Sequence, residues 1–233
     1  MKQSQFYYLL RRGLFSGGSS IIKKGLVMFN KFTTAGISHP AQGSAEFNGS
    51  SDYIQLDNAF SYTNHTIAAW VYFSANDSNF FDNRDANDDG LRFELNGSTN
   101  LNYSINSSDL NANPLTLNRW YFVAGTYDGT TQRLYIDGSQ AASATTSQTI
   151  STTTNAKIGR VSYTSIALMD GNLANVAIWN RALTSDEINS VMWKSYQELS
   201  STETSGLQAW YSLDNIDGST VPDSTGNHNG TAN

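Results

Sequence analysis

The residues best suited to bind a cation lie in one short loop. Residues 85–90 read D-A-N-D-D-G, so oxygen-bearing side chains alternate along a predicted tight turn. Carboxylate and amide oxygens are the ligands that Ca²⁺ takes in proteins, and a glycine permits the sharp bend that such loops need. The pattern predicts a calcium site with Asp85, Asn87 and Asp89 as ligands. The alternative is a hairpin loop that the same side chains stabilise through hydrogen bonds to their own backbone.

Aromatic residues in predicted loops are candidates for sugar binding. Phe80 lies close to Asp82 and Asn83, and Tyr163 lies between Ser162 and Thr164. A glycan site needs an exposed aromatic platform surrounded by polar hydrogen-bonding groups. We therefore predict Phe80 and Tyr163 as glycan-binding residues.

Groups that perform catalysis are sparse. The chain has no Cys, and it has three His that are scattered in sequence. It contains no H-E-x-x-H motif, no G-x-S-x-G motif and no phosphate-binding loop. We predict that the protein is not an enzyme.

Charge is distributed unevenly along the chain. Residues 1–45 contain six basic residues and no acidic one, whereas residues 46–233 contain eight basic and twenty acidic residues. The basic segment also holds two apolar clusters, which are unfavourable in water without a partner. We predict that residues 1–43 form an extended anchoring arm. Its partner-contacting residues are Phe6, Tyr7, Tyr8, Leu9, Leu10, Arg11, Arg12, Ile21 and Ile22.

Composition and apolar runs exclude several classes of protein. The absence of Cys excludes a disulfide scaffold. No apolar run approaches the ~20 residues that a membrane span needs. The first apolar run, residues 6–10, is shorter than the roughly 7–15 residues of a signal-peptide core, so we expect assembly in a cytoplasm. Six positive charges among many apolar residues match a nucleic-acid surface poorly, so we predict no nucleic-acid partner.

The elements that would position these groups are mostly strands. Residues 91–95 alternate apolar and polar side chains, which predicts a half-buried strand. Two Asp-Gly turns within residues 120–143 predict a three-stranded meander. Residues 184–187 read T-S-D-E, a capping box that begins one short helix near 185–198. These patterns predict an all-β protein, a two-sheet antiparallel sandwich.

The same strands resemble a known family. The matching stretches are AEFNGSSDYIQL (45–56), HTIAAWVYF (65–73), NRWYFVAGTYDGTTQRLYIDG (118–138), AKIGR (156–160), DGNLANVAIWNRALTSDEI (170–188) and GLQAWYSLDNIDGSTVPDSTGNHNGT (206–231). They resemble the laminin-G-like jelly rolls of the concanavalin A-like lectin/glucanase superfamily, of the type found in tailed-phage structural proteins. The resemblance implies one jelly-roll domain over residues 44–233. The last stretch commonly opens such domains, so we expect the tail to return as the partner strand of the first strand of the sheet. A truncated second repeat is the alternative.

The resemblance also implies particular site residues. In similar domains the D-S-x-G-N loop helps to hold a structural calcium, which would make Asp223 and Asn227 ligands. The strand before WNRAL would supply Asn175, where many relatives carry Asp, or the nearby Asp170. The glycoside hydrolases of the superfamily use an E-x-D-x-x-E pattern, which the five Glu residues of this chain do not follow.

Three functions follow from these expectations. The first is a non-enzymatic virion structural or decoration protein of a phage capsid or tail, assembled in the host cytoplasm and displaying a lectin-like domain. Its partners would be other virion subunits and cell-surface glycans, and association into a homo-oligomer stays open. The alternative is a bacterial carbohydrate-binding adhesin or lectin at the cell surface. The third, a glycoside hydrolase, is disfavoured because the catalytic carboxylate pattern is missing.

Overall fold

The structure of the protein is a computed structural model that describes residues 43–233, apart from residues 165, 166, 215 and 217. The predicted anchoring residues, from Phe6 to Ile22, lie outside the described residues. The boundary between the arm and the jelly roll therefore stays a prediction.

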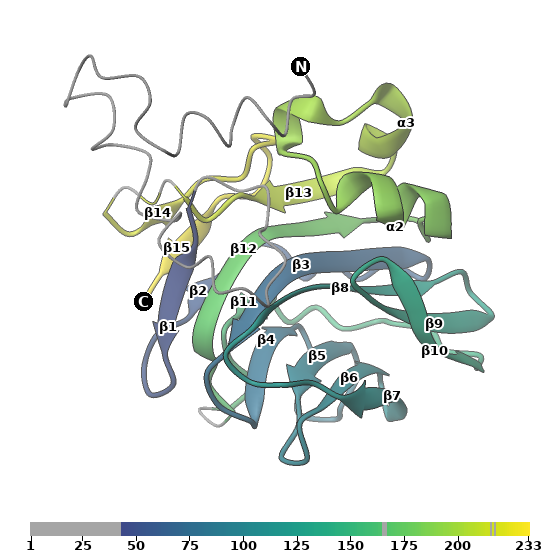
Figure 1. Ribbon diagram of the computed structural model, residues 1–233, viewed down its shortest axis with the longest axis horizontal. Helices are drawn as coiled ribbons and strands as arrows, with labels where there is room; N and C mark the ends of the chain where they lie inside the picture. The colour runs from purple at the N-terminus through teal and green to yellow at the C-terminus, as the bar shows by residue number, and fades with distance from the viewer. Residues whose placement is uncertain (1–42, 165–166, 215, 217) are drawn as a thin grey trace, which may run out of the picture. The chain divides into compact units, whose positions relative to one another are not determined.

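The described chain folds into two antiparallel sheets (Figure 1). The seven-stranded sheet has the order β1 (Ala45–Asn48), β12 (Asp170–Trp179), β3 (His65–Phe73), β8 (Trp120–Tyr127), β9 (Thr131–Ile136) and β10 (Ser139–Thr145), with β13 (Leu207–Tyr211) also paired to β12. The eight-stranded sheet has the order β14 (Thr220–Val221), β15 (Gly230–Ala232), β2 (Ile54–Gln55), β11 (Lys157–Ile158), β4 (Ser78–Asp82), β5 (Leu91–Leu95), β6 (Asn100–Ile105) and β7 (Ser108–Pro114). The predicted all-β sandwich and the meander of β8, β9 and β10 are confirmed.

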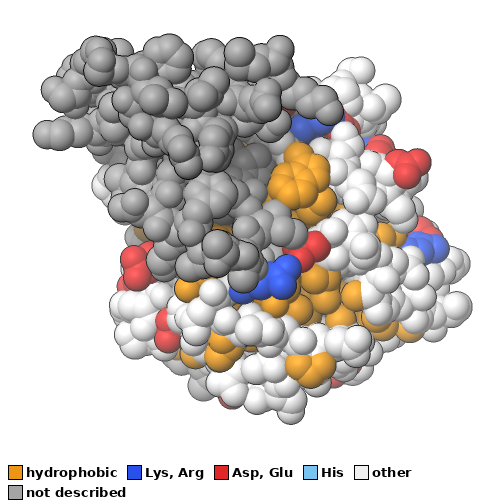
Figure 2. All heavy atoms as spheres, viewed as in Figure 1, with side chains coloured by type: hydrophobic (Ala, Val, Ile, Leu, Met, Phe, Trp, Pro, Cys, Tyr) orange, Lys and Arg blue, Asp and Glu red, His pale blue; other side chains and the backbone are white. Residues whose placement is uncertain are grey.

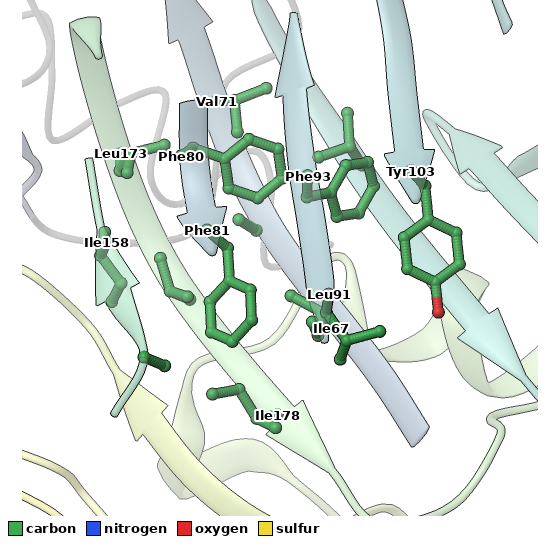
Figure 3. Packing of buried hydrophobic residues seen from close by; sticks show 14 of the residues in the cluster. Ile67, Val71, Phe80, Phe81, Leu91, Phe93, Tyr103, Ile158, Leu173 and Ile178 are labelled. Atoms are coloured by element: carbon green, nitrogen blue, oxygen red, sulfur yellow. The ribbon is translucent and has the colours of Figure 1, made fainter. Parts of the chain in front are cut away.

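The main core lies between the two sheets (Figure 3). Along β5, Leu91, Phe93 and Leu95 are buried while Arg92 and Glu94 are partly exposed, which confirms the predicted alternation. Phe93 packs against Phe80 and Tyr103 from the neighbouring strands, with ring centroids 4.6 and 5.2 Å apart. Successive side chains of a strand point to opposite faces, so the polar residues that alternate with these apolar ones lie on the outer face of the eight-stranded sheet.

A second apolar layer covers the outer face of the seven-stranded sheet. It is built around Trp70, Trp179 and Trp210, whose exposed fractions are 2% or less. The elements that follow β12 pack there, and Figure 1 shows them on the side of this sheet away from β4–β7. They are α2 (Ser185–Val191), η2 (Tyr196–Glu198) and α3 (Ser201–Thr204).

The predicted helix begins as expected but is shorter than the range near 185–198 that the sequence predicts. Thr184 accepts a hydrogen bond from the amide of Glu187, and the Glu187 carboxylate accepts from the amide of Thr184, so the capping box is present. The helix ends at Val191, and a second capping box at Ser195 and Glu198 begins a separate 3₁₀ turn. With seven residues, α2 is the longest helix in the described part of the chain, and none there could cross a membrane.

The C-terminal tail completes the same sandwich. Strand β13 pairs with β12, and β15 pairs with β2 through Thr231 opposite Gln55. The tail returns to the domain as expected, but the predicted pairing with the first strand is wrong, because β15 pairs with β2 while β1 pairs with β12. The alternative of a truncated second repeat is wrong, because the tail contributes strands to both sheets of the one domain.

Candidate functional site

The outer face of the eight-stranded sheet carries a row of polar side chains. Lys157 lies opposite Asp82, Asp82 opposite Arg92, and Arg92 opposite Ser104. Directly paired residues of antiparallel strands point to the same face, so β11, β4, β5 and β6 together present this row. The neighbouring pairs, Ile158 with Phe81 and Phe93 with Tyr103, point into the core.

A bulge in β4 overturns one predicted sugar contact. The register of β4 with β5 shifts between Asn79 and Phe81, so the extra residue, Phe80, turns inward together with Phe81. Both rings are fully buried, and Figure 3 shows them among the core side chains. The prediction that Phe80 is a glycan platform is therefore wrong.

Asp82 is the centre of a buried polar network at the end of β4. Its carboxylate accepts hydrogen bonds from the Arg84 Nε at 3.0 Å and from the Ser162 hydroxyl and amide at 2.7 and 3.2 Å. Arg84 also pairs with Asp88. Burial raises the pKa of Asp82, while the Arg84 guanidinium and the Ser162 hydroxyl oppose that shift. The network ties the loop that begins at Arg160 to the sheet.

Tyr163 stands on this tied loop. Its side chain is 47% exposed, and the Arg84 guanidinium lies 5.6 Å from the centre of its ring. A cation on one side of an aromatic ring is held by attraction to the ring's negative face. The expected exposure of Tyr163 is confirmed, and its role in glycan binding stays a prediction.

Two further cations bind the backbone of this loop and lie over a second tyrosine, Tyr53. The Lys157 Nζ donates to the carbonyl oxygen of Ser162 at 2.5 Å, and Arg160 donates to the carbonyl oxygen of Thr164 at 2.8 Å. Both cations lie over the Tyr53 ring, Arg160 at 4.5 Å and Lys157 at 5.7 Å from its centre. We call Tyr53, Arg84, Lys157, Arg160 and Tyr163 the tyrosine–cation surface.

The D-A-N-D-D-G loop is a hydrogen-bonded turn in the structure. The Asp85 carboxylate accepts from the amides of Asn87 at 2.8 Å and Asp89 at 3.1 Å, and these bonds lower the pKa of Asp85. The Asp89 carboxylate accepts from the Ser151 amide and hydroxyl. The geometry matches the alternative of a self-stabilised loop, and calcium binding there stays a prediction.

The acidic residue of the D-S-x-G-N loop, Asp223, is also engaged in hydrogen bonds within the protein. The Asp223 carboxylate accepts five hydrogen bonds, from the amides of Trp210, Thr225, Asn227 and His228 and from the Thr225 hydroxyl. A carboxylate offers about four lone-pair positions, so Asp223 is fully engaged by hydrogen bonds in this structure, and its role as a calcium ligand stays a prediction.

The other residues predicted to complete that calcium site are spread along β12. Asn175 lies at a bulge with a φ of 49°, and Asp170 lies five residues earlier, about 17 Å along an extended strand. Within residues 43–233 as described, no three His, Asp or Glu side chains gather in a metal-binding group. Asn175 and Asp170 are alternative donors, so their separation along β12 does not decide between them, and calcium binding there stays a prediction.

Four of the five glutamates have structural contacts. Glu187, Glu198 and Glu203 each accept hydrogen bonds at a helix start, and Glu203 also pairs with Lys194 at 2.7 Å. Glu94 pairs with Arg92 at 3.2 Å, and burial raises the pKa of Glu94 while Arg92 opposes. This carboxylate lies on the outer face and was not singled out from the sequence.

Figure 2 shows how few charges one face of the molecule carries. Hydrophobic side chains gather there in patches, and Lys, Arg, Asp and Glu side chains are few. The large hydrophobic side chains that are clearly exposed in the described chain include Tyr163 and Trp193, at 47% and 51%. Trp193 packs on Trp70 over the seven-stranded sheet, so it belongs to the other layer of the sandwich.

Comparison with known proteins matches the fold. The sequence profile of the concanavalin A-like lectin/glucanases superfamily matches residues 48–189, which is more than half of the chain. Among curated protein sequences, none matches the chain.

Several solved structures share the fold at low identity. A Bacteroides ovatus protein assigned to carbohydrate binding is 22% identical with a TM-score of 0.64, and the match covers 82% of this chain and 57% of that protein. Domain 4 of a Geobacillus stearothermophilus arabinanase, in complex with arabinotriose, is 20% identical with a TM-score of 0.53 and covers 64% and 76%. A sialidase carbohydrate-binding module of Ruminococcus gnavus, bound to α2,3-sialyllactose, is 13% identical with a TM-score of 0.54 and covers 64% and 96%.

Proposed function

The chain belongs to the concanavalin A-like lectin/glucanases superfamily, and from that membership we propose that it is a non-catalytic carbohydrate-binding protein of the lectin or adhesin type. The observation that carries the proposal is Tyr163, a half-exposed ring on a loop that buried hydrogen bonds fix to the sheet. A fixed, exposed aromatic ring with polar neighbours is the usual platform for a sugar. The solved structures with arabinotriose and sialyllactose support binding of carbohydrate by this fold.

The non-catalytic part of the proposal rests on the carboxylates. Asp82 is buried and engaged by Arg84 and Ser162, and three of the five glutamates cap helices. Glu94 is held by Arg92. A glycosidase needs two carboxyl groups that flank an open bond-cleavage site, and these five carboxylates do not supply such a pair.

We expect Tyr163→Ala to weaken glycan binding about tenfold, which corresponds to ~1.4 kcal/mol, because the sugar loses its stacking platform. The measurement is the dissociation constant of a glycan selected on a glycan array, by calorimetry with the full chain. Trp193→Ala is the matched control, since it removes an equally exposed ring from the other layer. Equal affinities of Tyr163→Ala and the wild type would contradict the proposed surface.

A second candidate function is favoured by the charge of the first 45 residues. A segment with six basic residues, no acidic residue and two apolar clusters suits an anchor on a larger assembly. We propose that this segment anchors the lectin-like domain to capsid or tail subunits of a phage particle, where many copies would raise avidity.

Deleting residues 1–32 should abolish incorporation into particles while glycan binding stays unchanged. Incorporation is measured by quantitative mass spectrometry of purified particles, with Tyr163→Ala as the control that should still assemble. If the deletion variant is incorporated at full occupancy, the anchor proposal fails.

A further inference from the structure

In the described chain, the edges of the two sheets are protected from further pairing at every end but one. The β13 edge is covered by the D-S-x-G-N loop, because the Trp210 amide donates to the Asp223 carboxylate at 2.8 Å and the Trp210 carbonyl oxygen accepts from the Ser224 amide. Strand β7 contains Asp109 and Pro114, a charge and a residue without an amide hydrogen. Strands β1 and β14 are only four and two residues long. Charges, prolines and short edge strands are the usual means by which proteins prevent sheet edges from pairing with other chains.

Strand β10 forms the end that lacks this protection. It ends the seven-stranded sheet (Figure 1), is seven residues long and contains no charged residue and no proline. Each of its residues is exposed or half-exposed. Its register with β9 shifts once, between Gln140 and Ala142, so residues 142–145 form a regular stretch. An open strand edge of this kind is a template for another strand.

The regular stretch presents backbone hydrogen-bonding groups at this edge. Just beyond it, the Thr146 amide donates to the carbonyl oxygen of Thr130, the residue before β9. Backbone groups of successive residues point to opposite sides of a strand, so those of Ser143 and Thr145 face away from β9. Within the described chain, β10 pairs with β9 alone. Two amides and two carbonyl oxygens are therefore available to a further strand.

A second copy of β10 suits this edge in shape and charge. A two-fold axis at Ser143 would place Ser143 opposite its own copy and Ala142 opposite Ala144, so small side chains meet small ones. Both alanines pack against the core, so this register keeps the inner faces of the two copies on the same side. Residues 46–233 contain twenty acidic and eight basic residues, so identical copies repel each other over most of their surface. An uncharged strand is where they can approach.

From these observations we infer that β10 is a homodimer interface, at which two copies pair antiparallel and join their seven-stranded sheets. A contact of the same strand with itself closes after two copies, because each copy then has its edge occupied. The inference goes beyond the proposed function and does not depend on it. Where the proposed function holds, the dimer presents two glycan sites, which raises avidity for a glycan-bearing surface.

The test is the mass of the full chain by sedimentation equilibrium over a range of concentrations. The wild type should sediment as a dimer, with twice the chain mass of 25.5 kDa. The variant Ser143→Glu should dissociate at least tenfold more readily. Within one copy its carboxylate lies opposite Arg133, which is compatible with the fold, but at the interface it meets a second carboxylate. Ser98→Glu, in the exposed turn between β5 and β6, is the matched control and should leave the dimer unchanged.

A single introduced thiol reports the pairing directly, because the chain has no Cys. Residues that form a hydrogen-bonded antiparallel pair have Cα atoms about 5.5 Å apart, a separation that a disulfide bridges. Under mild oxidation Ser143→Cys should form a disulfide-linked dimer, and Ser98→Cys should not.

Three results would overturn the inference. A wild-type chain that stays monomeric at millimolar concentration excludes a second copy as the occupant and leaves the edge to a strand of another protein. Self-association that Ser143→Glu does not weaken shows that the copies meet elsewhere, for example through residues 1–45. A Ser143→Cys protein that sediments as a dimer but forms no disulfide leads to the same conclusion.

Discussion

Asp82→Asn is expected to lower the free energy of unfolding by about 3–5 kcal/mol, because it removes one partner of a buried ion pair. Asp82 is fully buried and the Arg84 side chain is 4% exposed, so neither charge is compensated by water. The asparagine keeps the shape but leaves the guanidinium with Asp88, whose side chain is 40% exposed. Urea denaturation monitored by tryptophan fluorescence measures the change.

The functional consequence follows from the same network. Ser162 is bound to Asp82 through both its hydroxyl and its amide, and Tyr163 is the next residue. An Asp82→Asn protein that still folds should therefore bind glycan more weakly, since the loop that carries the ring is released.

The control for this prediction is Asp109→Asn. Asp109 also pairs with an arginine, Arg92 at 3.0 Å, but its side chain is 49% exposed. Exposed pairs contribute roughly 0–1 kcal/mol, so this variant should be close to the wild type in stability. A cost for Asp82→Asn no larger than that of Asp109→Asn would show that the network does not hold the loop.

The sequence predicted the strands and the helix start far better than the contacts between side chains on the outer face of the eight-stranded sheet. Alternation along residues 91–95 and the T-S-D-E capping box are local signals, and both are confirmed. The exposure of Tyr163 was also expected, from the polar residues Ser162 and Thr164 on either side of it. For the strand and the capping box the deciding interaction lies within a few residues, where pattern and structure are directly coupled.

Long-range register explains what was missed. Lys157 meets Asp82 only because β11 pairs with β4, 75 residues apart in the chain, and no local pattern specifies that pairing. Phe80 was misassigned for a related reason, since a bulge in β4 turns it into the core against the expected alternation. The AKIGR stretch contains Lys157 and Arg160, but the sequence does not show that both cations lie over the Tyr53 ring and bind the loop that carries Tyr163.

His65 provides the second large expected effect, a loss of stability in mild acid. It is fully buried in β3, its Nδ1 donates to the carbonyl oxygen of Tyr62 at 3.0 Å, and its Nε2 accepts from the Tyr103 hydroxyl. The Tyr127 ring packs 5.9 Å away. Burial lowers the pKa of His65 to about 4, while hydrogen bonds to the backbone of Tyr62 and Thr63 oppose the shift. The imidazole is therefore neutral in the folded protein at pH 7.

The direction of this change in stability with pH follows from proton binding. Between pH 6.5 and 4 the unfolded chain binds a proton at His65 and the folded chain does not, so stability falls as the pH falls. The expected loss between pH 7.5 and pH 4.5 is about 2–3 kcal/mol, since each unit of pKa difference corresponds to ~1.4 kcal/mol. Glu203, whose pKa is lowered to about 2 because hydrogen bonds from Lys194, Ser190 and Ser200 outweigh burial, loses its contribution only at lower pH.

The measurement is the free energy of unfolding by urea at half-unit steps across this range, for the wild type and His65→Gln. Asp82 and Glu94, whose pKa values burial raises, act in the opposite direction in both proteins, so they cancel in the difference. His65→Gln should be less stable at pH 7.5 and should lose less stability on acidification. An NMR titration of the wild-type His65 ring checks the cause directly. A ring that titrates near pH 6.5 in the folded protein would refute the assignment, because the buried imidazole would then accept a proton without cost.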